Sequence, residues 1–238
     1  MRSLNDKRTR DEEQLFVAEG IKLVEEILGS TLHIRRIYTT RTDLRGANVE
    51  CVERREMERI SMLKTPSDTL AIVEQPRNKF TLKRLANRLS IALDEVQNPG
   101  NLGTIIRLAD WFGIEDVICS KECADIFNPK VVQATMGALL RVRVHYVDNL
   151  SEVLRSAAEL DLPIYGTLLD GNNIYSEKLA TRGIIVMGNE GRGVSEECRN
   201  ALTHKLFIPP YPANRPTSES LNVAMATGII LAEFRRPK

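Results

Sequence analysis

Apolar runs and amphipathic helical patterns alternate along the chain from Ser90 onward. The runs are four to seven residues long, which is typical of strands, and lie at Ser90–Leu93, Asp116–Cys119, Arg141–Val147, Pro163–Thr167, Gly183–Met187 and Lys205–Ile208. Helical patterns separate them at Leu102–Phe112, Pro129–Leu139, Ser151–Leu160, Glu196–Ala201 and Ser220–Phe234. Strict alternation of this kind predicts an α/β fold with a parallel sheet flanked by helices on both faces.

The residues before Pro76 predict a second, smaller α/β unit. The apolar residues between positions 15 and 28 recur at helical spacing behind the acidic run Asp11-Glu12-Glu13, which suits a helix N-terminus. We therefore predict a helix that buries Leu15, Phe16, Ile21, Val24, Ile27 and Leu28. The remaining patterns predict strands at Ile34–Thr39, Val49–Val52 and Thr69–Val73, and a charged helix at Glu53–Leu63.

A basic stretch separates the two parts. Residues 77–88 read RNKFTLKRLANR, with five basic residues and no acidic one. We predict a domain at 1–76, a basic linker at 77–89 and a second domain at 90–238. The basic residues beside Phe80 could bind phosphate groups. They are explained at least as well by a solvent-exposed linker with no binding role.

Composition excludes several classes of protein. The 238 residues carry a net charge of +1, so binding to a polyanion would depend on local patches. No apolar run approaches the roughly 18 residues that span a bilayer, and the first residues lack the apolar core of a secretory signal. The four cysteines form no CxxC pair and have no histidine nearby, which predicts no metal site and a reduced, cytoplasmic compartment.

Three polar segments lie where predicted strands end or helices begin. In the first, Asn98-Pro99-Gly100-Asn101 turns the chain into a helix, and Arg107 lies one turn beyond Gly103. The second is the glycine turn Gly188-Asn189-Glu190-Gly191-Arg192-Gly193. In the third, Ile208-Pro209 precedes a helix start at which Ser220 and Asn222 flank Leu221. Ligands of α/β proteins bind at the carboxyl edge of the sheet, where such segments meet.

Each segment also has a plain structural interpretation. The glycine turn lacks the dinucleotide and P-loop fingerprints, and Glu190 would repel phosphate, so it suits a cationic ligand or one with hydroxyl and amine groups. A tight turn explains it equally well. Helix capping explains the serines of the third segment, but it does not explain Asn222, a poor helix former.

The ordered set of segments resembles the three motifs of the SpoU (TrmH-like) RNA 2′-O-ribose methyltransferases, within the SPOUT class. The motifs appear as NPGNLGTIIRLADWFG, IIVMGNEGRG and FIP…SESLNVAMATGIILAEF, and the intervening ADIFNPKVVQATMGAL is also similar to that family. The likeness covers residues 90 to the C-terminus. LFVAEGIKLVEEIL resembles the small α/β substrate-binding domain often attached to these enzymes.

The resemblance implies a parallel sheet with a C-terminal trefoil knot, a homodimer, and S-adenosyl-L-methionine as the cofactor. It implies that the polar active-site residues are Asn98, Arg107, Glu190, Ser220 and Asn222. It implies cofactor binding by the main chain of Gly188, Ile208 and Leu221, and by Thr167 and Asn189. Arg107 is expected to contact the ribose 2′-oxygen or the adjacent phosphate, and Glu190 is expected to orient Arg107.

The expected partner is structured RNA, ribosomal rather than transfer RNA, with no membrane and no metal. Three alternatives remain open: a non-catalytic RNA-binding relative, a knotted enzyme that methylates a base, and, with least support, a nucleotide-dependent enzyme.

The loop PYPANRPTSE, between Ile208-Pro209 and Ser220, departs from the family because it is longer and rich in proline. Because of this difference, the contacts of Ile208 and its neighbours with the cofactor are expected to differ from those in the family. Prolines 210, 212 and 216 are expected to stiffen the loop, and Tyr211 or Arg215 to reach RNA.

Overall fold

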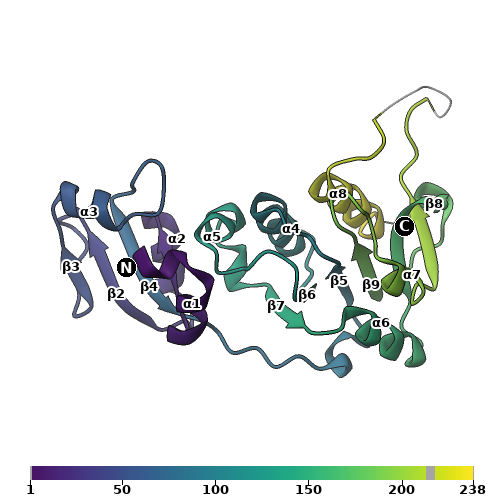
Figure 1. Ribbon diagram of the computed structural model, residues 1–238, viewed down its shortest axis with the longest axis horizontal. Helices are drawn as coiled ribbons and strands as arrows, with labels where there is room; N and C mark the ends of the chain where they lie inside the picture. The colour runs from purple at the N-terminus through teal and green to yellow at the C-terminus, as the bar shows by residue number, and fades with distance from the viewer. Residues whose placement is uncertain (1, 213–217, 238) are drawn as a thin grey trace. The chain divides into compact units, whose positions relative to one another are not determined.

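The computed structural model describes residues 2–212 and 218–237. The chain folds into two compact units (Figure 1). Unit 1 consists of residues 1–77 together with 125–140, and unit 2 consists of residues 78–124 together with 141–238. The sequence analysis did not foresee that residues 125–140 belong to unit 1.

Unit 1 is built on a four-stranded sheet in the order β1-β4-β2-β3. Strand β4 runs antiparallel to β1 and β2, and β2 pairs in parallel with β3. In chain order, the elements before residue 77 are η1 (Arg2–Asn5), α1 (Lys7–Glu13), β1 (Leu15–Glu19), α2 (Ile21–Leu28), β2 (Ile34–Thr39), β3 (Val49–Cys51), α3 (Arg54–Ile60) and β4 (Thr69–Glu74). The three strands and the charged helix predicted after residue 30 are all present.

The predicted helix over residues 15–28 is wrong in its first part. Leu15 and Phe16 belong to strand β1, and only Ile21–Leu28 is helical. A residue with positive φ lies on each side of strand β1. Gln14, between α1 and β1, has a φ of 54°, and Gly20, between β1 and α2, has a φ of 103°. The acidic run lies in the last turns of α1, where Asp11 pairs with Lys7 across one turn.

Residues 125–140 pack into unit 1 because their side chains find partners there. They form α5 (Pro129–Thr135) and η3 (Ala138–Leu140). The buried Arg10 binds Asp125, with 2.6 Å between Nη2 and Oδ2, and the rings of Phe16 and Phe127 lie 5.1 Å apart. The amide of Gln133 donates to the carbonyl of Glu19 at the end of β1 (2.7 Å).

Unit 2 contains six parallel strands in the order β10-β8-β9-β5-β6-β7. This confirms the prediction of a parallel sheet flanked by helices. The strands are β5 (Leu89–Leu93), β6 (Asp116–Ser120), β7 (Arg143–Val147), β8 (Ile164–Asn173), β9 (Gly183–Met187) and β10 (His204–Phe207). The helical elements are η2 (Leu82–Leu85), α4 (Pro99–Trp111), α6 (Leu150–Glu159), η4 (Ile174–Ser176), α7 (Glu196–Arg199) and α8 (Val223–Phe234).

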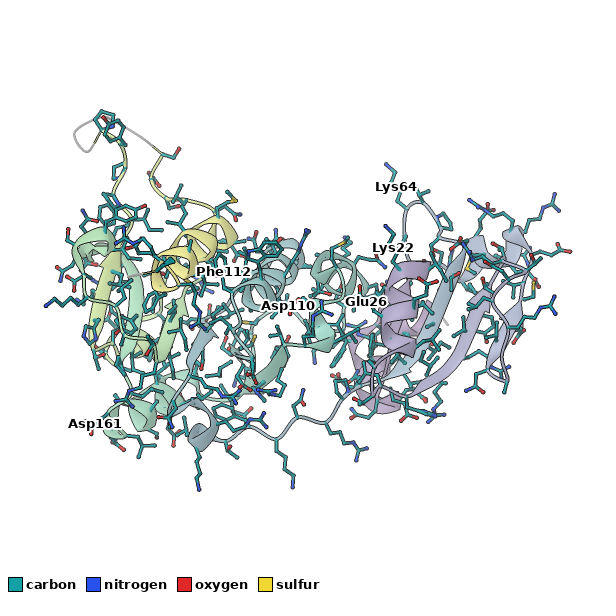
Figure 2. The ribbon with its side chains drawn as sticks, turned by 180° about the vertical axis from the view of Figure 1, so that it is seen from behind. Lys22, Glu26, Lys64, Asp110, Phe112 and Asp161 are labelled. Atoms are coloured by element: carbon teal, nitrogen blue, oxygen red, sulfur yellow. The ribbon has the colours of Figure 1, made fainter. Side chains whose placement is uncertain are left out.

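Helices cover the sheet of unit 2 on both sides. Apolar side chains of η2, α6 and α7 pack with Ala92, Ile118, Ile184 and Val186 in one buried cluster. Figure 1 shows α4 and α8 on the side away from α6. These two helices pack against each other, and Arg235 at the end of α8 donates to the carbonyl of Phe112 (2.9 Å), which is labelled in Figure 2.

The register of the central strands positions the polar segments. β5 and β9 pair in parallel, with Leu93 opposite Met187 at their last residues. The loop that leads to α4 and the glycine turn therefore leave the sheet side by side at its carboxyl edge.

Candidate functional site at the carboxyl edge of unit 2

The glycine turn after β9 is closed by its own backbone. Asn189 and Gly193 exchange two main-chain hydrogen bonds of 2.9 Å, and the Asn189 side-chain oxygen accepts the N–H groups of Gly191 and Arg192 (both 3.0 Å). Gly188 has no room for a side chain, because a Cβ there would overlap the backbone of Gly193 and Val194. A glycine at position 188 is therefore a steric requirement of this turn.

The loop after β5 fastens the glycine turn from the other side. The buried Asp94 accepts the N–H of Ser195 (2.7 Å), and the carbonyl of Glu95 accepts the Asn189 amide (2.8 Å). The carboxylate of Glu95 forms an ion pair with Arg192. Glu95 has a φ of 58°, a left-handed conformation that costs a non-glycine residue about 1 kcal/mol. The surrounding contacts must hold Glu95 in this conformation.

Glu190 connects the glycine turn to the start of α4. Its carboxylate accepts the N–H of Asn98 (3.1 Å), the N–H of Gln97 (3.4 Å) and the side-chain amide of Asn101 (2.9 Å). Burial would raise the pKa of Glu190, but hydrogen bonds from Asn101 and from main-chain N–H groups hold that pKa below its usual range. The carboxylate is therefore ionised at neutral pH and acts as an acceptor.

Asn101 also binds the third segment. Its side-chain oxygen accepts the amide of Asn222 (3.0 Å), so one asparagine joins Glu190 of the glycine turn to the start of α8. The sequence analysis did not select Asn101. The sequence nevertheless contained a signal for Asn101. It lies one helical turn after Asn98, so its side chain is expected close to the same neighbours as that of Asn98.

The side chains of Asn98 and Asn222 cap helices. Asn98 accepts the N–H groups of Gly100 (2.8 Å) and Asn101 (3.3 Å), and Asn222 accepts those of Ala224 (3.0 Å) and Met225 (3.3 Å). The interpretation that capping leaves Asn222 unexplained is wrong, because α8 begins at Val223 and not at Ser220. Asn222 is both an N-cap and part of the polar network.

The side chains of Arg107 and Ser220 are exposed and, within residues 2–212 and 218–237, take no hydrogen-bond or ion-pair partner. Arg107 shares the exposed face of α4 with Thr104 and Trp111. No contact between Arg107 and Glu190 is present among those residues, so the expected orientation of Arg107 by Glu190 finds no support. The structure gathers Glu190, Asn98, Asn222 and the unforeseen Asn101.

The five residues expected to bind the cofactor differ in whether their polar groups are already hydrogen-bonded within the protein. The main-chain groups of Gly188, Ile208 and Leu221 have no hydrogen-bond partner in the described part of the chain. Thr167 donates its hydroxyl to the carbonyl of Val186 (3.2 Å), and the polar groups of Asn189 hold the glycine turn. S-adenosylmethionine carries polar groups that can bond to free main-chain amides and carbonyls. The residues at this edge of the sheet therefore fit this cofactor.

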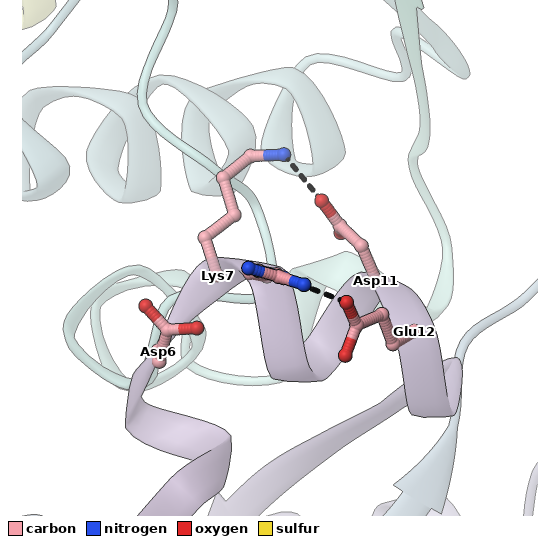
Figure 3. Close-up of a pocket in the computed structure, with 5 residues that line it drawn as sticks. Asp6, Lys7, Asp11 and Glu12 are labelled. Atoms are coloured by element: carbon pink, nitrogen blue, oxygen red, sulfur yellow. Dashed lines mark hydrogen bonds and ion pairs between the residues drawn. The ribbon is translucent and has the colours of Figure 1, made fainter.

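Other features of the described residues carry no chemistry of this kind. A surface hollow beside α1 in unit 1 is lined by Asp6 and by two ion pairs, Lys7–Asp11 and Arg8–Glu12 (Figure 3). Within the described ranges, no cluster of His, Cys, Asp and Glu could hold a metal ion, and no helix is long and apolar enough to cross a bilayer. Tyr211 is 96% exposed; Arg215 and Pro216 lie outside the described residues.

Comparison with known proteins assigns both parts of the chain. Residues 88–232 match the SpoU rRNA methylase family, and residues 1–71 match the MRM3-like substrate binding domain. The chain is 31% identical to the 23S rRNA (guanosine(2553)-2′-O)-methyltransferase RlmP of Bacillus subtilis, over 98% of this chain and 94% of that protein.

Solved structures agree with this assignment. A protein assigned to the TrmH family of RNA methyltransferases, from Porphyromonas gingivalis, superposes with a TM-score of 0.88 and 39% identity, over 99% of this chain and 95% of that one. An rRNA methyltransferase from Sinorhizobium meliloti with bound AdoMet superposes with a TM-score of 0.86 and 31% identity, over 99% and 92% of the two chains.

The chain belongs to the SpoU rRNA methylase family. It is an RNA 2′-O-ribose methyltransferase, and its cofactor is S-adenosylmethionine.

Proposed function

We propose that this chain methylates a ribose 2′-hydroxyl of ribosomal RNA at the carboxyl edge of unit 2. The observation that carries the proposal is the bridge made by Asn101, which joins Glu190 to Asn222 and so brings the three motif segments into one site. The relative RlmP, named for the 2′-O-methylation of 23S rRNA, supports ribosomal RNA as the substrate.

The main chain of Gly188, Ile208 and Leu221 would hold the cofactor. Bound S-adenosylmethionine supplies an electrophilic methyl group on a sulfonium. The protein positions the ribose. It also provides a site protected from water, which favours the reaction because charge is lost as the 2′-oxygen reacts. Ser220 and the amide of Asn222 lie on either side of Leu221 and are suited to hold the ribose.

Arg107 is the group assigned to the 2′-oxygen or the neighbouring phosphate. A guanidinium keeps its proton at any physiological pH, so it is a poor general base. It instead lowers the energy of the developing alkoxide and grips phosphate through two N–H groups. Arg107 is exposed and without a partner in the described residues, so it is available for this role. Glu190 is assigned the task of holding Asn101 and the start of α4.

The proposal includes a trefoil knot near the C-terminus. Strand β10 lies at the edge of the sheet, yet α8, which follows it, packs against α4 beside the central strands. This change of neighbours between two consecutive elements supports the knot that membership of the SpoU family suggests.

Unit 1 is assigned to RNA binding, with the linker 77–89 between the two predicted domains. Lys22 and Lys64 are exposed and have no ion-pair partner in the described residues, and Figure 2 shows both projecting from the same side of this unit. Such cations are available to phosphate groups of RNA. The cytoplasm, where ribosomal RNA is modified, is the proposed compartment.

A second copy of this chain is the proposed partner of α4 and α8. Trp111 on α4 is 83% exposed and Met225 on α8 is 63% exposed, although these helices pack together. Large apolar side chains exposed on neighbouring helices are typical of protein interfaces, and aromatic and methionine residues are enriched there.

The proposed function is tested by methyl transfer to RNA. The purified chain is incubated with S-adenosylmethionine labelled in the methyl group and with unmodified 23S rRNA transcribed in vitro, and the modified nucleotide is mapped. We expect one ribose 2′-O-methyl group. Label on a base would favour a base methyltransferase, and RNA binding without transfer would favour a non-catalytic relative.

A further inference from the structure

Arg192 is a second exposed cation at the edge of the proposed site. It lies in the glycine turn, two residues after Glu190, and 71% of its side chain is exposed. In the described part of the chain, its guanidinium has one partner, the carboxylate of Glu95. A guanidinium carries five N–H donors, so a contact through one terminal nitrogen leaves most of them available.

Glu95 holds Arg192 from a fixed position. The N–H of Glu95 donates to the hydroxyl of Ser120 (3.1 Å), and its carbonyl accepts the amide of Asn189 (2.8 Å). These contacts maintain the left-handed backbone at φ 58°, which a glutamate adopts only where its surroundings require it. The carboxylate, 27% exposed, is thereby set against the guanidinium before any ligand binds.

The position of Arg192 determines which ligand it can meet. The neighbouring Glu190 binds the first turn of α4 and, through Asn101, the start of α8, so the glycine turn borders the polar network. An RNA chain that presents a ribose to this network carries a phosphate on each side of that ribose. A planar guanidinium matches the oxygens of a phosphodiester better than any other side chain does.

We propose that Arg192 binds an RNA phosphate next to the target ribose, and that Glu95 is a positioning residue that sets its guanidinium for this contact. The proposal rests on the proposed methylation of RNA, and it adds a residue of the glycine turn that takes no part in the network of Glu190, Asn98, Asn101 and Asn222. The competing explanation is a structural latch, in which the pair only fastens the loop after β5 to the glycine turn.

Substitution of each partner alone separates these explanations. The latch needs both side chains equally, whereas the phosphate contact needs the charge of Arg192 and depends on Glu95 only for the orientation of the guanidinium. Arg192→Gln, Glu95→Gln and Arg192→Lys are made in the full chain. For each, we measure kcat and KM with unmodified 23S rRNA transcript, the salt dependence of binding to that RNA, and cofactor affinity by calorimetry. Arg155→Gln, at another exposed arginine, on α6, is the matched control.

We expect Arg192→Gln to raise KM for RNA about tenfold, to change kcat little, and to reduce the slope of log K against log salt by about 1. Arg192→Lys keeps the charge and should retain the slope. Glu95→Gln should leave the slope unchanged, because the cation remains, but should raise KM for RNA by a smaller factor than Arg192→Gln, because the guanidinium loses its orientation. Arg155→Gln should change neither the slope nor KM.

Equal losses of cofactor affinity in Arg192→Gln and Glu95→Gln, with an unchanged salt slope in both, would establish the latch and overturn the phosphate contact. An Arg192→Gln slope equal to that of the wild type would overturn it as well. The salt measurement needs no methyl transfer, so failure of the proposed function would appear separately, as absence of transfer by the wild-type chain.

Discussion

At the scale of single residues, Asn101 and Asn98 show how closely a bridging side chain and a capping side chain lie together. Both are in the first turn of one helix, and both lie near Glu190. Asn98 turns its side chain back to cap α4, whereas Asn101 turns outward to Glu190 and Asn222. Chemistry and sequence position are almost the same, and the direction of the side chain decides the role.

The two asparagines should therefore respond differently to substitution. Asn98→Ala removes a cap and should cost about 1 kcal/mol of stability with a small effect on kcat. Asn101→Ala breaks the bridge between Glu190 and Asn222 and should lower kcat at least about tenfold, a typical cost of losing a positioned polar group. Urea unfolding and methyl-transfer rates measure both effects. The opposite pattern would move the catalytic assignment to Asn98.

Arg107→Ala tests the residue assigned to the 2′-oxygen. Loss of the guanidinium should lower kcat by roughly 10²–10³ while cofactor affinity stays nearly constant, because the proposed role places the arginine against the reacting oxygen and not against the cofactor. Single-turnover methyl transfer and calorimetry with S-adenosylmethionine provide the measurements. Arg155→Ala is the control, and methyl transfer at the wild-type rate in the Arg107 variant would remove this residue from the mechanism.

At the scale of elements, neighbouring strands place a buried charged cluster at the amino end of the sheet of unit 2. Asp116 on β6 pairs in register with Arg143 on β7. Its carboxylate accepts Arg143 Nη2 (2.8 Å) and contacts His145 Nε2 (2.9 Å), and its side chain is 2% exposed. This cluster lies at the opposite end of the strands from the proposed site and acts on stability.

Asp116→Asn should destabilise the fold by roughly 3 kcal/mol, since it removes the buried carboxylate that Arg143 and His145 contact and leaves Arg143 with only the half-exposed Glu115 as a counter-charge. The measurement is urea unfolding at pH 7. Asp110→Asn, at the surface pair with Arg141, is the control and should cost less than about 1 kcal/mol. Equal costs for the two variants would show that burial of the cluster contributes nothing.

The same carboxylate predicts a pH dependence. Burial would raise the pKa of Asp116, but hydrogen bonds from Arg143 and His145 hold that pKa below its usual range. A depressed pKa means that the stabilisation is complete above the unfolded value, near pH 4, and is lost as the pH falls through the folded value. Melting temperature between pH 3 and 7 should therefore drop more steeply at the acid end for the wild type than for Asp116→Asn.

At the scale of the whole molecule, a segment from the middle of the chain completes the fold of unit 1. Residues 125–140 supply Phe127 to the ring of Phe16 and Asp125 to the buried Arg10. The guanidinium of Arg10 also donates to the carbonyls of Leu4 (2.8 Å) and Asn5 (2.7 Å). One buried arginine thus ties together the N-terminus and a segment more than one hundred residues away.

Removal of either partner of this pair should be costly. Arg10→Ala leaves Asp125, whose side chain is 10% exposed, without its counter-charge and should cost roughly 3 kcal/mol. The double variant Arg10→Ala/Asp125→Ala should be less unstable than the sum of the single variants, because it leaves no unpaired charge. Denaturant unfolding of the four proteins gives the coupling energy, and strict additivity would show that the pair is not coupled.

The proposed dimer is tested on the exposed face of α4. Trp111→Asp places a charge where an apolar contact is expected and should shift the protein from dimer to monomer in sedimentation at micromolar concentration. Leu160→Asp, at an exposed leucine at the end of α6 (63% exposed), is the matched control and should leave the mass unchanged. A wild-type chain that sediments as a monomer would end the proposal.

The sequence by itself determined the strands, the helices and the order of the polar segments. Buried parallel strands are continuous apolar runs, and amphipathic helices repeat every 3.6 residues, so local pattern suffices for both. It failed at β1, where consecutive buried residues happen to fit helical spacing and the left-handed turns at Gln14 and Gly20 carry no periodic signal.

The tertiary structure decided what no local pattern can express. Three contacts illustrate this: Asn101 with Glu190, Glu95 with Arg192, and Arg10 with Asp125. Each joins residues that lie 89 to 115 positions apart in the sequence. A sequence pattern reports which face of an element is buried, because burial depends on neighbours along that element. Which side chains meet across elements depends on strand order and register, and these are fixed only when the whole chain packs.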